Sequence, residues 1–159
     1  MTVLNYRTGP TLLVRVAADA AAEIRPGALL ALVGGSAVPA AAMPWPGDAD
    51  AAREAFAGAF LGVAHSASPA GDGGPVSVCV GPQAVYAPGL TPGGCAFGAA
   101  LGPADDGAAL LDDRLTPVPD RGAAVARALE AAPAGAAAVR CTFASAFHPG
   151  SGHAAAAVG

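Results

Sequence analysis

The chain has no lysine and little charge of either sign. All eight basic residues of its 159 are arginines, charged residues make up 13%, and the formal net charge is −4. A chain of this kind has no basic patch that could neutralise a run of phosphates, so we expect no nucleic-acid partner. A surface with few charges is also one that another protein can cover at low desolvation cost, which is a first indication of a role in assembly.

Cysteine is scarce, and its spacing excludes the common cysteine motifs. Cys79, Cys95 and Cys141 are far apart in the chain, and none belongs to a Cys-x-x-Cys pair. The usual zinc and redox motifs are therefore absent. Cys79 and Cys141 each lie within an alternating strand pattern, so we expect small buried side chains with unreactive thiols.

Long apolar runs are missing as well. No run of 18 or more large apolar residues occurs, so we expect no transmembrane helix, although 53% of the residues are hydrophobic and the mean hydropathy is +0.49. Residues 1–10 show no basic segment followed by an apolar core, so we expect no secretory signal. The expectation is a chain that remains in a cytoplasm or is assembled there into something larger.

Glycine and proline are abundant, and they divide the chain into short segments. The stretch 60–80 is the clearest case: Phe60–Ala64 is apolar, residues 65–74 are rich in turn formers, and Val76, Val78 and Val80 recur at every second position. Alternation of this kind is typical of a half-buried strand. We therefore predict two strands joined by a polar loop at the centre of a β-rich domain.

Other segments show similar strand or turn signals. Arg25-Pro26-Gly27 predicts a turn, because proline sets φ at the second position and glycine permits positive φ at the third. Residues 17–23 could form a helical turn. Residues 122–132 leave strand and helix open, with strand favoured for 124–129. The further predicted strands are 11–16, 28–33, 83–87, 95–101 (closed by Gly102-Pro103), 114–118 and 139–145, with a loop or edge segment at 36–46 around Trp45.

One helix is predicted, over about Asp48–Ala57. Asp48 or Asp50 can cap it, and Ala52 and Phe56 share one helical face. The fold class is therefore mainly β: a compact β-barrel or β-sandwich of short strands with one short α-helix. We expect a single β-rich domain over residues 11–147, an extended N-terminal arm over 1–10 and a flexible C-terminal tail over 148–159.

Residues with catalytic chemistry are few. His65, Asp72 and Cys79 could in principle form a Cys–His–Asp site, but Asp72 lies in a glycine-rich tip and Cys79 in the middle of a strand. His148 and His153 lack a third metal ligand nearby. We therefore expect no catalytic residue, no metal and no cofactor.

Four aspartates, Asp105, Asp106, Asp112 and Asp113, form an acidic, turn-rich patch. Carboxylates and loop carbonyls can hold Ca²⁺, but the spacing does not match an EF-hand loop. We expect a solvated acidic loop, and ion binding at residues 105–113 stays open from the sequence.

The order of these segments resembles a known family. An Arg-Pro-Gly turn and apolar strand (24–33) precede a capped alanine-rich helix that leads into Phe-Leu-Gly-Val-Ala (60–64). A strand ending near Tyr86, the Gly-Pro-Ala-Asp-Asp segment (102–106) and a last alternating strand (139–145) follow. In this the chain resembles the small capsid decoration, or cement, proteins of tailed-phage heads.

The resemblance implies a structural virion protein without an active site. Such a protein binds the outer surface of a phage capsid and bridges subunits of the major capsid protein. It would be assembled in the cytoplasm of a bacterial host, with copies of itself as further partners (a trimer, for example) and with no nucleic-acid or membrane partner. The side chains predicted to contact the capsid or another partner are Tyr6, Arg7, Trp45, Tyr86 and Phe147.

Two alternatives stay open from the sequence. One is a small ligand-binding or thiol-dependent enzymatic β-barrel domain, with Cys79 or the aspartate loop as its site. The other is a head-fibre or tail-associated protein of the same virion. Thiol reactivity separates the enzymatic alternative, because a catalytic cysteine is exposed and has a low pKa.

Overall fold

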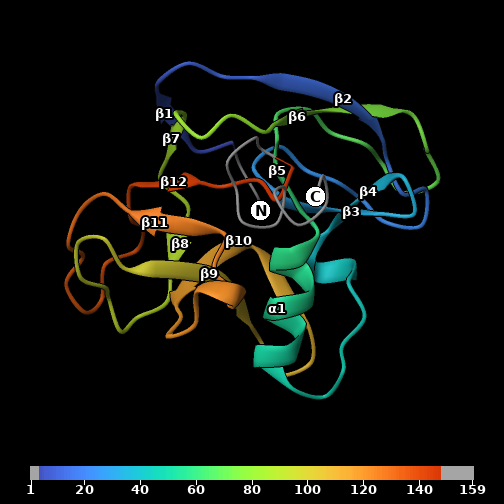
Figure 1. Ribbon diagram of the computed structural model, residues 1–159. Coiled ribbons are helices and arrows are strands. Elements are labelled where there is room, and N and C mark those ends of the chain that lie inside the picture. Colours follow the sequence, from blue (N-terminus) through green and yellow to red (C-terminus); the bar gives the residue numbers. More distant parts are fainter. Residues whose placement is uncertain (1–3, 148–159) are drawn as a thin grey trace, which may run out of the picture.

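The computed structural model describes residues 4–147, and it confirms a mainly β chain. Twelve strands, one α-helix and two short 3₁₀ helices occur in this part of the chain. The strands form two sheets, one of five strands and one of seven (Figure 1). None of the helices in residues 4–147 has the length and apolar character needed to cross a bilayer.

The five-stranded sheet is built around the predicted central stretch. β5 (Phe60–Ala64) lies in its middle and pairs in antiparallel fashion with β6 (Pro75–Cys79), the strand that the alternation of Val76 and Val78 predicted. The Arg25-Pro26-Gly27 turn is also confirmed, with Gly27 at φ 91°. In the order across the sheet, the strands are β2 (Leu13–Ala17), β6 (Pro75–Cys79), β5 (Phe60–Ala64), β3 (Leu29–Val33) and β4 (Ser36–Pro39).

This sheet curls until its two outer strands meet. Ala18, which follows β2, forms a parallel bridge with Ala37 of β4, and the Asp19 amide donates to the Ala37 carbonyl at 2.9 Å. The apolar side chains on the inner face form a separate core cluster, which includes Ile24 and Leu30. The five strands therefore enclose a small barrel-like core of their own.

Gly62 permits the close approach of β5 and β6. A side chain at this position would collide with the carbonyl oxygen of Cys79 on the neighbouring strand. The backbone of Gly62 has φ 159°, at the edge of the region that side chains avoid. Any larger residue here must push the central pair of strands apart.

The seven-stranded sheet contains the later strands together with β1. Neighbouring strands of this sheet are antiparallel, except that β8 runs parallel to β10. In the order across the sheet, the strands are β1 (Tyr6–Thr8), β7 (Val85–Tyr86), β12 (Cys141–Phe143), β11 (Ala126–Ala128), β9 (Ala100–Asp105), β10 (Leu110–Pro117) and β8 (Gly89–Leu90).

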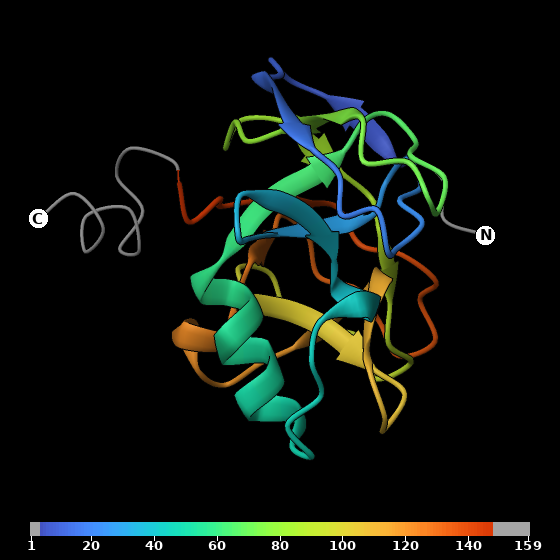
Figure 2. The same cartoon turned by 90° about the vertical axis from the view of Figure 1, so that its right-hand side faces the viewer.

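The single α-helix, α1 (Ala49–Gly58), begins where the sequence predicted. The Asp48 carboxylate accepts a hydrogen bond from the Ala51 amide at 3.0 Å, as an N-cap residue does. The helix passes almost directly into β5 (Figure 2). Its buried face carries Phe56, which packs with Phe60 in the main core, with ring centroids 5.7 Å apart.

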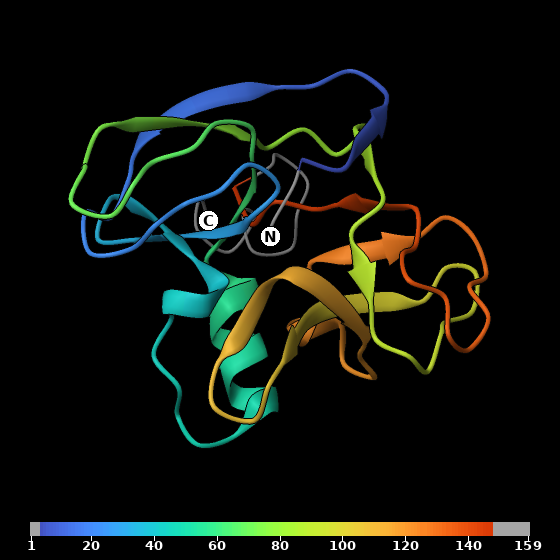
Figure 3. The same ribbon diagram turned by 180° about the vertical axis from the view of Figure 1, so that it is seen from behind.

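Arg53 fixes α1 against the seven-stranded sheet. Its Nε donates to the carbonyl of Pro103 at 2.8 Å, and its guanidinium forms an ion pair with Asp105, both in β9. A second ion pair joins it to Asp50 on the helix at 3.2 Å. The curved β10 passes close to the helix on the same side (Figure 3). The helix and sheet are thus joined by a polar clamp as well as by the core.

Several predicted segments differ from the structure. The predicted helical turn at 17–23 is wrong, because Ala18 bridges to β4 and the following residues form a turn. The strand predicted for 95–101 begins only at Ala100, and Gly102-Pro103 lies inside β9 instead of closing it. Proline is tolerated there because β11 pairs with β9 only at Ala100 and Leu101.

The segments that the sequence left undecided contain short strands and 3₁₀ helices. Residues 121–123 (Arg121–Ala123) form a 3₁₀ helix, η2, and Ala126–Ala128 form β11, so the strand favoured for 124–129 is confirmed in its central part. The segment 36–46 contains edge strand β4 and a second 3₁₀ helix, η1 (Ala40–Ala42). Within the expected arm, β1 pairs with β7 of the same chain. The predicted tail 148–159 lies outside the described residues.

Candidate functional site

An aromatic cluster joins the two sheets. β1 places Tyr6 opposite Tyr86 of β7, and His65 follows β5. The Nε2 atom of His65 lies 2.7 Å from the Tyr86 hydroxyl. The ring centroids of Tyr6 and Tyr86 are 5.8 Å apart, and those of Tyr6 and His65 are 6.1 Å apart. The Tyr6 hydroxyl donates to the Gly9 carbonyl at 2.5 Å within the arm. The pairing of β1 with β7, together with the hydrogen bond from the Ala87 amide to the Asn5 carbonyl at 3.0 Å, holds this part of the arm on its own domain.

Burial keeps both members of the His65–Tyr86 pair neutral. Burial raises the pKa of Tyr86 far above its usual value, with the neighbouring Cys79 thiol adding to the effect, so the phenol retains its proton. Burial lowers the pKa of His65, so its ring is neutral at pH 7 and Nε2 can accept the phenol proton in a hydrogen bond. The pair therefore forms a stable interior contact.

The hypothetical Cys–His–Asp site is not assembled. His65 and Cys79 both lie next to Tyr86. Asp72, however, is exposed in the tip of the β5–β6 loop, where its carboxylate accepts from the Gly74 amide at 2.8 Å. Without a carboxylate to orient it, His65 lacks the third group on which triad chemistry depends.

The two cysteines that the sequence places in alternating strands are buried in the structure. Cys79 and Cys141 are buried free thiols, which confirms their predicted interior position. Burial raises the pKa of Cys141, so its thiol stays protonated at neutral pH. Cys95 is half-buried, and its backbone bridges to Ala132.

The aspartates do not form one loop. Asp105 lies at the end of β9 beside Arg53, and Asp112 and Asp113 lie in β10. Of the four aspartates, Asp106 alone lies in the turn between these two strands. The Asp106 carboxylate accepts from the Ala108 and Ala109 amides at 2.9 and 2.8 Å. Burial, followed by the charge of Asp113, raises the pKa of Asp112. Within the described residues, no group of three or more His, Cys, Asp or Glu is placed to hold a metal ion.

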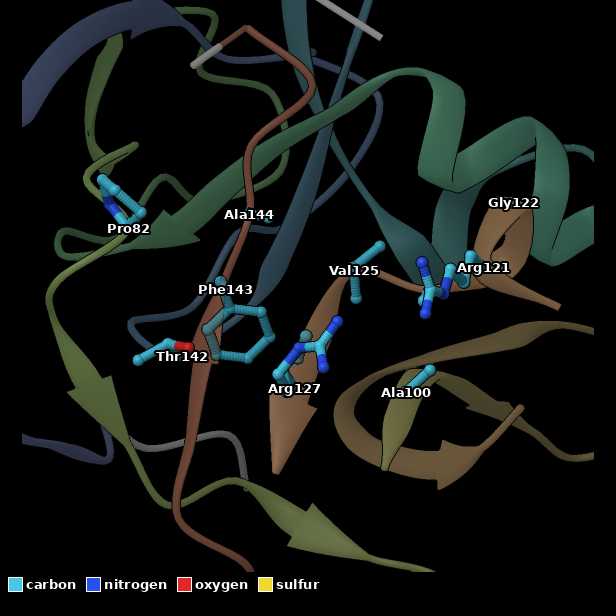
Figure 4. Close-up of a pocket in the computed structure, with 11 residues that line it drawn as sticks. Pro82, Ala100, Arg121, Gly122, Val125, Arg127, Thr142, Phe143 and Ala144 are labelled. Carbon is cyan, nitrogen blue, oxygen red and sulfur yellow. The ribbon is translucent and has the colours of Figure 1, made fainter. Parts of the chain in front are cut away.

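A pocket of about 740 Å³ opens over β9, β11 and β12 beside η2. Arg127 alternates with the buried Ala126 and Ala128, so its side chain projects from the outer face of the sheet. Arg121 approaches the pocket from η2. Figure 4 shows both arginines among the lining residues. We call this pocket the β11 groove; it is lined by Pro82, Ala100, Arg121, Gly122, Ala124, Val125, Ala126, Arg127, Thr142, Phe143 and Ala144.

Sequence reasoning missed the β11 groove. The Ala-Arg-Ala alternation over 126–128 does indicate that Arg127 points away from the core once this segment is taken as a strand. The neighbours of Arg127 could not be predicted, because they depend on the register that sets it opposite Thr142 on one side and Ala100 on the other.

The predicted contact residues lie in different surroundings. Arg7 and Phe147 are exposed, whereas Tyr6 and Trp45 are half-buried and pack against the core. Tyr86 is a correction: it is only 1% exposed, because β7 turns its ring into the core, so it cannot reach a partner directly. The exposed large apolar residues that the sequence analysis did not select are Leu4, Leu12, Leu13, Val33, Phe97 and Leu129.

Phe97 is the most exposed of these side chains, at 73%, and Leu129 is 40% exposed. The two residues lie on neighbouring segments. Phe97 precedes Gly98 and Leu129 follows Ala128, and the Gly98 amide donates to the Ala128 carbonyl at 2.9 Å. We call them the Phe97–Leu129 pair. Both are exposed apolar residues on segments next to β11.

Comparison with known protein families gives no match, and comparison with curated proteins gives no match either.

Proposed function

We propose that this protein is a structural virion protein, which binds the outer surface of a phage capsid and stabilises the shell by bridging subunits of the major capsid protein. The observation that carries the proposal is the exposure of Phe97. A phenylalanine left largely in water gains free energy when a partner covers it. Its neighbour Leu129 extends the apolar area that a partner can cover.

The arrangement of the chain supports the same proposal. The segments that resemble decoration proteins correspond to β3, α1, β5, β6, β9 and β12, and each of them contributes side chains to the larger core. Low charge favours broad contacts, since few ions have to be desolvated. Many copies on a closed shell convert individually weak contacts into strong overall attachment. Self-association, for example as a trimer, belongs to this proposal, as does a location on the capsid surface.

The thiol-dependent alternative has less support. Cys79 and Cys141 are buried, and no carboxylate orients His65. One observation, the β11 groove, supports a ligand-binding role. We assign the groove to partner binding, because neither of its two arginines forms an ion pair within residues 4–147 and no acidic residue lines it.

Co-sedimentation with undecorated shells of the phage that encodes the protein tests the proposal. We expect saturable binding, and we expect Phe97→Ser to weaken it about tenfold, roughly the effect of uncovering one buried aromatic side chain. Val33→Ser is the matched control, because Val33 is an exposed apolar residue on the other sheet. Equal binding by wild-type protein and Phe97→Ser would contradict the assignment of this contact.

A further inference from the structure

The β11 groove carries two arginines without carboxylate partners. The ion pairs within residues 4–147 involve Arg25 and Arg53 only. Neither Arg121 nor Arg127 takes part in one, and no acidic residue lines the groove. In a chain of net charge −4, this is a local concentration of positive charge in a concave site.

The rest of the groove suits an extended main chain. Its floor runs across three strands, where Ala100, Arg127 and Thr142 are cross-strand neighbours. Most of its other lining residues are small, among them Ala124 and Ala144. Small side chains let another backbone approach closely, while the two guanidinium groups can each receive a carboxylate in bidentate fashion.

The apolar Phe97–Leu129 pair continues this surface. Leu129 directly follows β11, and its side chain is exposed, as that of Arg127 is. Phe97 adjoins the same segment through the Gly98–Ala128 hydrogen bond. A polypeptide crossing β11 would therefore meet positive charge first and an apolar contact next to it.

We infer that the β11 groove binds an extended, acidic polypeptide segment of the capsid shell subunit, with one or two of its carboxylates held by Arg121 and Arg127. This inference rests on the proposed function, because it names the part of the partner that the surface recognises. A nucleic-acid strand fits less well, since two arginines on an acidic protein can neutralise few phosphates.

A direct binding experiment tests the groove without shells. The probe is a fluorescein-labelled hexapeptide of alternating glutamate and alanine, followed by fluorescence anisotropy. We expect saturable binding by the wild-type protein, about tenfold weaker binding by Arg121→Gln and by Arg127→Gln, and an intermediate loss with Arg127→Lys. A hexapeptide with glutamine in place of glutamate should not bind.

Two exposed arginines outside the groove supply matched controls. Arg15 lies on β2 and Arg114 on β10, and neither side chain forms an ion pair within residues 4–147. Arg15→Gln and Arg114→Gln should bind the peptide as the wild type does. Equal losses in these controls, no saturable binding up to about 1 mM, or tighter binding of a single-stranded hexanucleotide would overturn the inference.

Co-sedimentation of the same variants with shells separates the two proposals. Weaker shell binding by Arg121→Gln and Arg127→Gln, together with weaker peptide binding, supports both. Shell binding that neither substitution affects overturns the groove as the contact and leaves the capsid function standing. Peptide binding that depends on the arginines, without any shell binding, overturns the capsid function and leaves an acidic-peptide site.

Discussion

His65 shows at the residue scale how packing decides protonation. Its ring lies between Tyr6 and Tyr86, and its Nε2 meets the Tyr86 hydroxyl at 2.7 Å. Protonation of the ring would place a proton on the atom that accepts from the phenol. Burial lowers the pKa of His65, whereas the unfolded chain titrates near the ordinary value of about 6.5.

The pH dependence of stability should report this residue. Because the folded-state pKa of His65 is lowered, the unfolded chain binds the proton more readily. The stability that depends on a neutral ring is complete above about pH 6.5 and is lost as the pH falls below it. We expect His65→Gln to show a flatter fall in the urea midpoint between about pH 7 and pH 5 than the wild type. Parallel curves would contradict this account.

Gly62 gives a second prediction at this scale. A methyl group there would meet the carbonyl of Cys79, so Gly62→Ala should lower the free energy of unfolding by roughly 2–4 kcal/mol. Gly34→Ala is the matched control: Gly34 has φ 57°, but a methyl group added there would have no neighbouring atom within 4 Å. Its cost should be only about 1–2 kcal/mol, from the left-handed backbone alone. Urea unfolding measures both, and equal losses would show that the close approach does not matter.

Thiol reactivity separates the structural proposal from a thiol-dependent enzyme. Cys79 and Cys141 are buried, whereas Cys95 is half-buried. We expect iodoacetamide to modify Cys95 first in the native protein at neutral pH, and to modify the other two only after unfolding. Mass spectrometry of peptides from the treated protein identifies the site. Rapid native modification of Cys79 would favour the enzymatic alternative.

At the scale of elements, a single substitution of Arg53 removes the polar clamp between α1 and β9. Arg53 is largely buried and joins the helix to Pro103 and Asp105 of β9. Arg53→Met removes the clamp and leaves Asp105 without its cation, but Asp105 is partly exposed and water can solvate it. We therefore expect a loss of about 2 kcal/mol, less than for a fully buried pair.

Arg25→Met is the matched control for the clamp. Arg25 pairs with Glu23 on the surface, where both side chains are about half exposed. Its loss should leave the urea midpoint almost unchanged, since water and salt screen an exposed ion pair. Similar losses for the two substitutions would contradict a specific role for Arg53.

The elements that sequence reasoning could predict are those specified by nearby residues. Val76 and Val78 alternate within β6, and Asp48 caps α1, so local chemistry determines both. The prediction for region 95–103 is wrong because its strand depends on distant partners. Cys95 bridges to Ala132, and Pro103 is tolerated inside β9 because the pairing with β11 stops at Leu101.

The candidate site was harder to predict than the fold for the same reason. Arg121 and Arg127 are six residues apart, with a 3₁₀ turn and the start of a strand between them. Their common pocket depends on Thr142 and Phe143 arriving from β12. Likewise, the sequence indicated Tyr86 as a contact residue, but the pairing of β7 with β1 and β12 buries it.

The whole molecule combines two apolar cores with a groove on its outer surface. One core lies inside the curled five-stranded sheet, and the larger one lies between this sheet, α1 and the seven-stranded sheet. The side chains of Arg121, Arg127, Phe97 and Leu129 are exposed and lie outside both cores. Substitutions of these four side chains should therefore change partner binding without changing the urea midpoint, which distinguishes them from substitutions in the clamp or at Gly62.

The most direct test of the central claim is the heat resistance of undecorated shells with and without the protein. Shell disruption is followed by light scattering while the protein is added up to saturation. The proposed function predicts that the disruption temperature rises with occupancy and levels off when the sites are full, and that Phe97→Ser needs a higher concentration to reach the same temperature. An unchanged disruption temperature at saturating protein would contradict it.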